Sequence, residues 1–464
     1  MLTYSFPSDM HISMYEYLYQ CIKKDIIELK LNPHEKLPSK RAFAKNQNVS
    51  LITVENAYNQ LLIEGYIYAI EKKGYFVSEI QYPPTATQKK VQLPQEKEHP
   101  FIIDLKTNSV SPTHFPFSTW SKLTRQVLSS QEPSLLARPP QQGCLSLREA
   151  ISKHLYAFSG MNVSPQQIII GAGTEYLYNL VIQLLGRHLI YALEDPGHRS
   201  ISKVYQLNDI TYQYIPLDQN GLSISELTKS KAQVVHISPA HHYPTGITMP
   251  IKRRLDILKW ANDQQHYIIE DDYDSEFRLR GKPISTLYQI DQNERVIYMN
   301  TFSKTLAPSF RISYMVLPPH LVQCFQEKLH FYACSVSSFE QIILAYFMQQ
   351  GYFEKHINRM RNSYKLIRDE FLYQLNQSSI AKQIEITEEN AGLHFLLHYQ
   401  SHYHDNDIIK KASQIGLHIS TLSQFYEHPY DSHTFVINYS GLSLQQIPIA
   451  VKLLNQLLNH NEMN

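Results

Sequence analysis

The chain has 464 residues, about three times the length of a typical single domain, so we expect two or more domains. Apolar residues make up 43% of it, which is enough for a large packed core and excludes a chain that is disordered throughout. A formal net charge of +1 excludes binding of nucleic acid by overall charge, so contact with DNA needs a local basic patch.

The N-terminal part of the chain is predicted to hold three helices. Apolar residues recur at helical spacing over about residues 12–29, which indicates an amphipathic helix. Ser39 is a good N-cap for a second helix over about residues 40–45, and Ser50 can cap a third helix after a short turn. Gly65 ends this third helix, whose apolar residues fall on one stripe.

Two short β-type runs, YIYAI and GYFVSE, follow the third helix, and a charged turn with Lys72 and Lys73 joins them. Three helices and a basic hairpin, with a short turn before the third helix, are the order of a winged helix-turn-helix. We therefore place a DNA-binding domain at residues 1–80. The next stretch is rich in Pro, Gln and charge and lacks apolar periodicity, which is typical of an extended linker, placed at residues 81–103.

The remainder of the chain, residues 104–464, alternates segments typical of strands and helices. Several strand-like segments are apolar runs between turn residues, as expected of parallel strands buried on both faces; they include QIIIGAG, LIYALED, VVHISPA, YIIEDDY, VIYMNTFSK and RISYMVLP. Helices fit between them, for example at residues 174–185 and 251–263. This order predicts an α/β doubly wound fold. From about Tyr352, a long helix and the runs GLHFLLHY and TFVINYS predict a smaller α+β subdomain.

The segment GAGT, which includes Gly173 and Thr174, lies between a predicted strand and a predicted helix. Ligands of parallel sheets bind beyond the carboxyl ends of the strands, and the first amides of a helix suit a phosphate. The backbone N–H groups and the Thr174 hydroxyl would face such a phosphate. Taken alone this signal is weak, because small residues before a helix are common for steric reasons.

A run of acidic residues in YIIEDDYDSEF follows the apolar residues 267–269. A charge run is usually a solvated loop. Here the apolar residues direct the first acids to the carboxyl edge of the sheet, where a carboxylate could keep a pyridinium nitrogen protonated. Tyr273 could donate a hydrogen bond to a phenolate oxygen on the same ring.

Lys304 follows the apolar run VIYM and two hydroxyl residues, Thr301 and Ser303, and Arg311 comes seven positions later. A lysine near a strand end, with hydroxyls and a guanidinium that can bind a phosphate, suits a Schiff base with an aldehyde cofactor. A lone lysine in a polar loop is usually a surface residue. The order of the three motifs along one βα alternation favours the cofactor site.

In this order, GAGT, SPAHHYPTG, EDDYDSEF and NTFSKTLAPSFRISYM resemble a fold-type I aminotransferase that depends on pyridoxal 5′-phosphate. Together with LPSKRAFAKNQNVSLITVENAYNQLLIEGYIYAIEKKGYFV, they make nearly the whole chain similar to the MocR subfamily of GntR-type bacterial transcriptional regulators. The resemblance implies an N-terminal winged helix-turn-helix joined by a linker to an aminotransferase-like domain with a smaller C-terminal α+β subdomain. It also implies a homodimer, matching an operator with two half-sites.

The resemblance assigns roles to residues of the three motifs. Lys304 would carry pyridoxal phosphate as an internal aldimine, Asp271 would pair with the pyridine nitrogen, and Tyr273 with the phenolic oxygen of the ring. The phosphate would be held by Gly173, Thr174, Thr301, Ser303 and Arg311. His198 lies where relatives often place an aromatic residue over the ring, although a hydrogen-bonded loop histidine is an equally good explanation.

Relatives usually clamp a substrate carboxylate with an arginine from the small subdomain, and this chain departs from that pattern. The strand-end stretch 436–442 contains no arginine, and we expect Gly441 at its position. A bidentate arginine is the natural receptor of a carboxylate, and whether Arg199 takes over this role is left open by the sequence. The departure argues against efficient transamination. It leaves open a regulator that senses pyridoxal phosphate itself, or an amine without a carboxylate.

The third N-terminal helix departs from relatives too, because they commonly carry an arginine directly after the turn serine. Here Ser50 is followed by Leu51 and Ile52, so base reading would depend more on Thr53 and Asn56. Phosphate contacts are expected from the second helix and the wing, at Ser39, Lys40, Arg41, Lys72 and Lys73. The alternative for Lys40 and Arg41 is ordinary solvated helix charge, but a helix N-terminus beside the turn favours DNA.

Other features indicate no further chemistry. The histidine-rich stretch 398–404, with Asp405 and Asp407, has metal-ligand residue types without a convergent pattern, so we expect no metal site. The four cysteines form no CxxC pair, which argues against a disulfide framework and fits a reducing compartment. The N-terminus lacks a signal pattern and no apolar run is long enough to cross a bilayer, so we expect a cytoplasmic protein without a membrane partner.

These features predict a DNA-binding transcriptional regulator that holds pyridoxal phosphate on Lys304 and senses a small amine or amino acid through the aldimine there. An effector amine would displace Lys304, and the change would reach the DNA-binding domain across the linker. Two alternatives remain, a regulator that senses pyridoxal phosphate itself and an active aminotransferase. The missing arginine argues against the enzyme.

Overall fold

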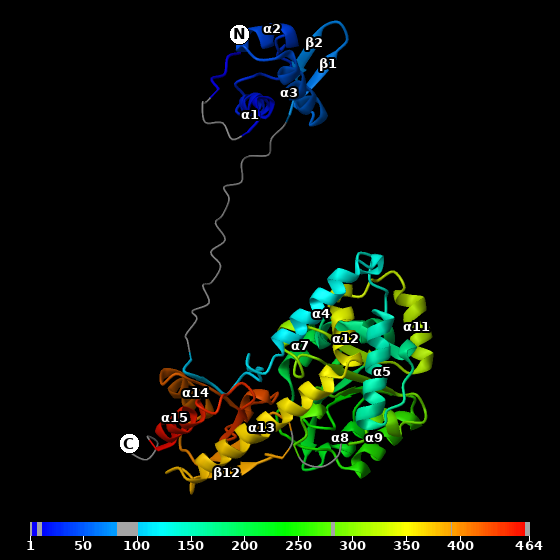
Figure 1. Cartoon of the computed structure of the whole chain (residues 1–464), viewed down its shortest axis with the longest axis vertical. Coiled ribbons are helices and arrows are strands. Elements are labelled where there is room, and N and C mark those ends of the chain that lie inside the picture. The colour runs from blue at the N-terminus through cyan, green and yellow to red at the C-terminus, as the bar shows by residue number, and fades with distance from the viewer. Residues whose placement is uncertain (1, 7–11, 81–100, 280–283, 391, 460–464) are drawn as a thin grey trace. The chain divides into compact units, whose positions relative to one another are not determined.

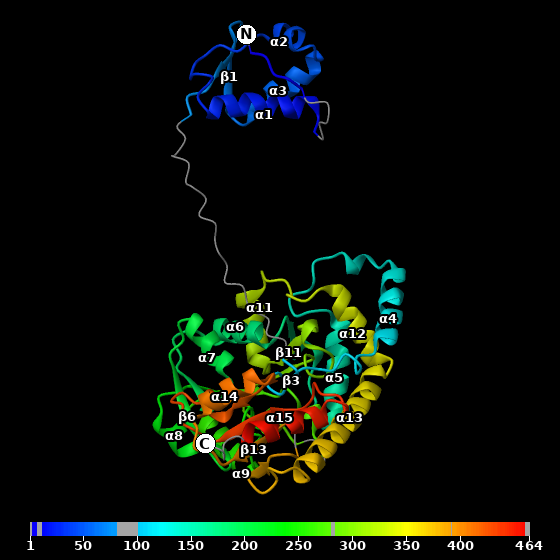
Figure 2. The same ribbon diagram turned by 90° about the vertical axis from the view of Figure 1, so that its left-hand side faces the viewer.

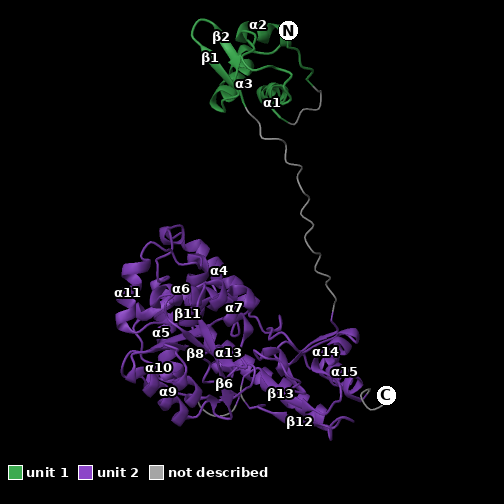
Figure 3. Ribbon diagram, turned by 180° about the vertical axis from the view of Figure 1, so that it is seen from behind, with its two compact units in different colours: residues 1–97 green, residues 98–464 purple. Residues whose placement is uncertain are grey.

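The structure is a computed structural model, and it describes residues 2–6, 12–80, 101–279, 284–390 and 392–459. The chain forms two compact units, Met1–Lys97 and Glu98–Asn464, which Figure 3 colours separately. Of the predicted linker, residues 81–100 lie outside the described residues.

Three helices and a two-stranded hairpin make up the N-terminal unit; they are α1 (Met14–Ile27), α2 (Lys40–Gln47), α3 (Leu51–Ile63), β1 (Ile67–Ile70) and β2 (Gly74–Val77). As predicted, Ser39 and Ser50 cap α2 and α3, because their hydroxyls accept hydrogen bonds from the N–H groups of Ala42 and Thr53 at 3.2 and 3.1 Å. The apolar faces enclose a core that includes Leu18, Ile22, Phe43, Val54, Tyr58, Leu61, Ile67 and Val77. The predicted winged helix-turn-helix is confirmed.

An eight-stranded sheet with the order β4-β11-β10-β9-β8-β5-β6-β7 forms the centre of the second unit. Its strands are β4 (Ile168–Gly171), β5 (Tyr191–Asp195), β6 (Tyr212–Asp218), β7 (Gly221–Leu222), β8 (Val234–Ile237), β9 (Tyr267–Asp271), β10 (Val296–Thr301) and β11 (Ser313–Val316). β5, β6, β8, β9 and β10 pair in parallel, whereas β11 is antiparallel to both β10 and β4. The apolar run of β11 is compatible with either direction, so the sequence did not reveal its antiparallel pairing.

Helices cover both faces of this sheet, as Figures 1 and 2 show. They are α4 (Phe117–Ser130), α5 (Leu145–Ser159), α6 (Thr174–Leu185), α7 (Arg199–Leu207), α8 (Ile224–Lys229), α9 (Ile251–Asp263), α10 (Leu287–Ile290), α11 (Pro319–Leu329) and α12 (Ser338–Gln349). Because successive strand residues point to opposite faces, Ile269 packs with α6 and α11, whereas Ile268 packs with α9. Within the described residues, every helix is too short or too polar to cross a membrane.

A smaller antiparallel sheet with the order β12-β13-β16-β15 forms the small subdomain. Its elements are α13 (Tyr352–Asn376), β12 (Ile384–Thr387), β13 (His394–Tyr399), α14 (Asp405–Gln414), β15 (Ser420–Thr421), β16 (Thr434–Asn438) and α15 (Ile447–Asn459). Figure 1 shows α13 running from the large subdomain into the small one, and Figure 2 shows α14 and α15 side by side. The predicted α+β subdomain is therefore present.

The last residues of the predicted linker, from Phe101 on, are described and are held by the small subdomain. β3 (Ile103–Asp104) pairs in parallel with β14 (Leu417–His418). The ring of Phe101 stacks on that of His418, with 4.2 Å between the ring centroids. The second unit therefore begins with a segment that is held by the small subdomain.

Leu61 is fully buried in the core of the N-terminal unit, whereas its neighbour Leu62 is only half-buried. We predict that Leu61→Ala lowers the free energy of unfolding of this unit by about 2–5 kcal/mol, because the shortened side chain leaves a cavity. Calorimetry of the full chain should show an earlier transition for this unit and an unchanged one for the second. Leu62→Ala is the matched control, and equal losses in both variants would contradict this packing.

Candidate active site

The carboxyl edge of the large sheet opens into a cavity of about 370 Å³. Eight of the nine predicted cofactor residues line it: Thr174, His198, Asp271, Tyr273, Thr301, Ser303, Lys304 and Arg311. The ninth, Gly173, directly precedes α6. The structure thus brings residues from the ends of two strands, the starts of two helices and the turn before β11 into one site, where ligands of such sheets bind.

Lys304 lies in the turn that follows β10. Its Nζ donates a hydrogen bond to the backbone carbonyl of Asn108 at 2.9 Å. Burial lowers the pKa of Lys304 to about 8, and the negative charge of Asp274 opposes this shift only in part. An amine with such a pKa is partly neutral near neutral pH, which is the form that attacks an aldehyde.

The buried Asp271 carboxylate has only one of its two oxygens in use. The Tyr178 hydroxyl donates to Oδ2 at 2.5 Å, and His236 Nε2 lies 3.7 Å from the same oxygen. Oδ1 is buried without a hydrogen-bond partner among the described residues. A buried carboxylate oxygen without a donor is unfavourable, so this atom fits the N–H of a protonated pyridine ring.

Tyr273 connects the cavity to a buried pair of polar side chains, His241 and Asp274. Its hydroxyl lies 3.2 Å from His241 Nδ1, and the same nitrogen lies 2.9 Å from Asp274 Oδ2. Burial raises the pKa of Tyr273 well above its usual value, with nearby carboxylates adding to the effect. The hydroxyl therefore stays protonated and can donate to an oxyanion in the cavity.

The start of α6 and the turn before β11 form a cradle for an anion. Gly173 has a φ of +93°, and a Cβ there would lie 2.2 Å from Arg311 Nη2, so glycine leaves room for the guanidinium. Arg311 Nη2 donates to Glu175 Oε2 at 2.6 Å, which fixes the guanidinium beside the helix. With Thr174 and Ser303 also at the cavity, the cradle suits a phosphate group.

Thr301 and His198 differ in their contacts with the rest of the protein. The Thr301 hydroxyl donates to Ser303 Oγ and accepts from Ser313 Oγ, both at 2.9 Å, so it holds the turn together. His198 is exposed at the start of α7, with its ring centroid 5.7 Å from that of Tyr243. Both of these rings line the cavity.

Several residues of the site were missed by the sequence analysis. Tyr178 lies one helical turn after Thr174, so the helical period of α6 could have placed it on the same face. His236 is a polar residue within an apolar strand, which is also a usable signal. Asn108 has no such signal, because it lies 196 residues before Lys304 and only the fold brings the two together.

The small subdomain offers no cationic group where relatives were expected to have one. Val436 is buried in an apolar cluster with Leu396 and Leu422. At Gly441 a Cβ would lie 2.3 Å from Ser109 Oγ, so a side chain at this position would displace the Ser109 hydroxyl. Arg199, by contrast, lines the cavity.

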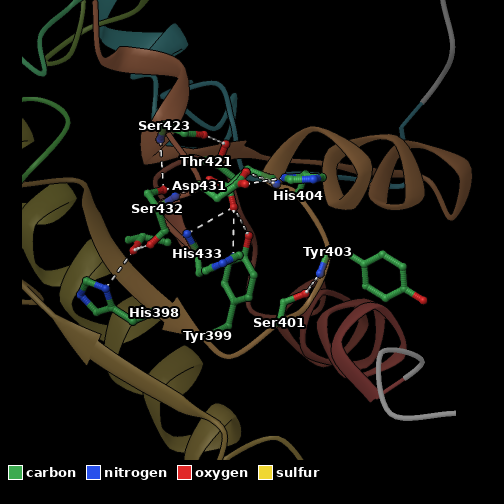
Figure 4. Close-up of polar contacts among 12 residues, drawn as sticks. His398, Tyr399, Ser401, Tyr403, His404, Thr421, Ser423, Asp431, Ser432 and His433 are labelled. Carbon is green, nitrogen blue, oxygen red and sulfur yellow. Dashed lines mark hydrogen bonds and ion pairs between the residues drawn. The ribbon is translucent and has the colours of Figure 1, made fainter. Parts of the chain in front are cut away.

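The histidine-rich stretch of the small subdomain forms a hydrogen-bond network (Figure 4). Asp405 is buried and accepts from the Tyr399 hydroxyl at 2.8 Å and from Ser432 Oγ at 3.0 Å. His398 lies 2.9 Å from each of two threonine hydroxyls. Across the described residues, His, Cys, Asp and Glu nowhere gather in a group of three that could hold a metal ion. The network instead fixes the loop before β16 against the start of α14.

The predicted DNA-binding residues lie on α2, α3 and the hairpin. Those with exposed side chains are Ser39, Arg41, Ser50, Asn56, Lys72 and Lys73. Lys40 Nζ donates to Glu55 Oε1 at 2.7 Å, and this hydrogen bond raises the pKa of Lys40. Thr53 is half-buried, and its hydroxyl lies 2.8 Å from Ser50 Oγ. Lys40 and Thr53 thus have partners within the unit, which the sequence did not indicate.

Comparison with known proteins identifies both units. Residues 14–77 match the family "Bacterial regulatory proteins, gntR family", and residues 102–454 match "Aminotransferase class I and II". The "Uncharacterized HTH-type transcriptional regulator YdeL" of Bacillus subtilis is 35% identical over 96% of each chain. The "Probable rhizopine catabolism regulatory protein MocR" of Rhizobium meliloti is 28% identical over 94% of this chain and 91% of its own. The chain belongs to the MocR subfamily of GntR-type transcriptional regulators.

The second unit of this MocR-type regulator has the fold-type I aminotransferase architecture. A kynurenine aminotransferase of Pyrococcus horikoshii, solved in complex with PMP, matches it with a TM-score of 0.69 and 25% identity, over 79% of this chain and 93% of that chain. Pyridoxal 5′-phosphate is the cofactor of this family, as predicted. The unpartnered Asp271 Oδ1, the buried Lys304 amine and the cradle at Arg311 fit its ring nitrogen, aldehyde and phosphate.

We predict that the cofactor-free regulator takes up pyridoxal phosphate covalently faster as the pH rises through about 8. Burial lowers the pKa of Lys304 from 10.5 to about 8, so the amine is protonated below this pH and free to react above it. The growth of the visible absorption band after mixing gives the rate at each pH, with Lys304→Ala as the unreactive control. A midpoint near 10.5 would contradict the burial of this amine.

Proposed function

We propose that this regulator binds operator DNA through its N-terminal unit and senses a small amine or amino acid with pyridoxal phosphate bound at Lys304. The observation that carries the proposal is the buried Asp271 Oδ1, which lacks a partner in a cavity also lined by Lys304 and Arg311. An acceptor, a nucleophile and a cation match the three functional parts of the cofactor.

When bound, pyridoxal phosphate supplies an aldehyde that condenses with a primary amine and releases water. Lys304 would provide the amine that holds this aldehyde, and an effector amine would compete for the same position. Asp271 would keep the ring nitrogen protonated, and Tyr273 would donate to the phenolic oxygen. Arg311 and the first amides of α6 would hold the phosphate, so that the group stays bound whether or not Lys304 is attached to it.

A chain of hydrogen bonds supports coupling between Lys304 and the small subdomain. Lys304 Nζ donates to the Asn108 carbonyl at 2.9 Å, and Ser440 Oγ donates to Asn108 Oδ1 at 2.8 Å. The Asn438 backbone N–H donates to the Leu105 carbonyl at 2.9 Å. These residues link the lysine to β16 and to the segment that follows β3. The position of the lysine therefore biases this segment, as coupling between two sites requires.

We propose Arg199 as the receptor for an acidic group of the effector. It lines the cavity, and its hydrogen bonds go to the neutral Tyr214 hydroxyl and a backbone carbonyl. None of the ion pairs between described residues includes Arg199. A guanidinium without an anionic partner is suited to bind a carboxylate with two hydrogen bonds.

We further propose that the regulator is a homodimer. Large apolar side chains are exposed to solvent on α4 (Phe117 and Leu128), after it (Leu136) and at the first residue of α5 (Leu145). Exposed apolar patches mark contact sites with another protein surface, and these residues are the candidates for such a site. Two DNA-binding units would then suit an operator with two half-sites.

The proposal predicts that a change in DNA affinity needs both pyridoxal phosphate and an effector amine. The DNA fragment is first selected from random duplexes by the protein. Its affinity is then measured for the cofactor-free protein, for the protein with pyridoxal phosphate, and for the protein with pyridoxal phosphate and each candidate amine. Visible absorption is recorded for the same samples. The effector should shift the absorption band and change the affinity by about fivefold or more. Lys304→Ala should bind the DNA but lose both responses.

Other results of this experiment would favour a different function. A full change in affinity with pyridoxal phosphate alone would favour a sensor of the cofactor itself. Steady-state turnover of an amino donor with a keto acid would favour an active aminotransferase. A wild-type protein that takes up no pyridoxal phosphate would contradict the proposal.

We predict that Arg199→Gln raises the concentration of a carboxylate-bearing effector needed for the half-maximal band shift by about tenfold or more, because a charged hydrogen-bond donor is lost. The response to amines without a carboxylate should stay unchanged. Arg253→Gln is the matched control, since Arg253 pairs with Asp218 at 2.7 Å outside the cavity. Equal weakening for both classes of amine would contradict the role of Arg199.

A further inference from the structure

The first turn of α3 presents two large aliphatic side chains to solvent. Ile52 is 68% exposed and Leu51 is 42% exposed, whereas Val54 of the same turn is fully buried in the core. Both follow Ser50, the N-cap of the helix. In helix-turn-helix proteins, the N-terminal residues of this second helix of the motif contact base edges in the major groove. The residues at the base-reading position are therefore apolar in this chain.

The polar side chains around this turn are engaged within the unit. The Thr53 hydroxyl lies 2.8 Å from Ser50 Oγ, and Ser50 Oγ also accepts from the Thr53 backbone N–H. Glu55 accepts from Lys40 Nζ at 2.7 Å. Leu51 and Ile52, by contrast, make no such contacts and present their aliphatic surface to solvent, where a base pair could meet it.

The charge around the aliphatic pair limits what can cover it. The exposed basic residues of α2 and the hairpin turn are Arg41, Lys45, Lys72 and Lys73. These cations suit the phosphates of a duplex, and phosphate contacts position a helix in the groove without reading its sequence. An apolar protein surface would leave the same cations without partners, so DNA is the occupant that the charges favour.

We propose that Ile52, with Leu51 beside it, reads thymine through apolar contact with its C5-methyl group. This inference rests on the proposed DNA-binding function and adds the base that the unit prefers. The thymine methyl is the apolar group on base edges in the major groove, and an aliphatic side chain cannot form the two hydrogen bonds that arginine gives to guanine. Asn56 is exposed one turn further along the same side of α3 and suits the adenine edge. The half-site should therefore carry A·T pairs beneath this turn.

The experiment starts from a pool of random DNA duplexes, from which the full-length protein selects its preferred site. Each thymine of the selected site is then replaced in turn by deoxyuridine, which lacks only the methyl group. Titrations at one fixed salt concentration give the affinity for each duplex. For the wild type, we expect one or two thymines per half-site at which this replacement weakens binding about fourfold, the effect of one buried methyl group.

Variants assign this effect to a side chain. Ile52→Ala should bind the thymine site about as weakly as the wild type binds the deoxyuridine site, and should no longer distinguish the two. Ile63→Ala is the matched control, because Ile63 is 81% exposed at the other end of the same helix and should keep the wild-type preference. Circular dichroism verifies that both variants fold.

The possible results separate this inference from the proposed function. Sequence-specific binding by the wild type with equal affinity for thymine and deoxyuridine at every position would overturn the inference alone. Methyl dependence that persists in Ile52→Ala would place the contact elsewhere and overturn it too. Failure of the selection to enrich any site would instead contradict the proposed operator binding.

Discussion

The parallel pairing of β9 with β10 fixes a buried carboxylate at the same sheet edge as a reactive lysine. Its register sets Asp271 opposite Met299, two residues before the end of β10, and the chain then turns to Lys304. The strand pairing holds Asp271 and Met299 in place. The Tyr178 hydroxyl donates to one oxygen of the Asp271 carboxylate. The other oxygen has no donor among the described residues, which costs free energy that a cationic ring nitrogen offsets. In the proposed function, both cofactor binding and effector sensing depend on this constraint.

How much of the site the sequence predicts depends on how local each contact is. Asp271, Lys304 and the start of α6 were predictable, because each lies at the end of an apolar strand or within three residues of it. The contact between Lys304 and Asn108 was not, because it depends on how the segment after β3 crosses the fold. The same holds for the direction of β11, since a strand buried on both faces has the same pattern in either direction.

In the N-terminal unit too, local features were predictable from the sequence and contacts between elements were not. Its three helices, caps and hairpin follow from periodicity and capping residues, and the structure agrees with them. The pairing of Lys40 with Glu55 depends on the packing of α2 against α3, which no local pattern specifies. Ser50 caps α3 and also engages the Thr53 hydroxyl, so the side chains that stabilise the first turn have part of their hydrogen-bonding capacity in use there.

The way in which β3 is held has a mechanical consequence. Phe101 and β3, at the start of the described part of the second unit, pack on His418 and pair with β14 of the small subdomain. This first segment is therefore held by the small subdomain. Under the proposed function, a rotation of the small subdomain on effector binding would move β3 with it, so the point at which the second unit receives the preceding chain would shift without a change in the large sheet.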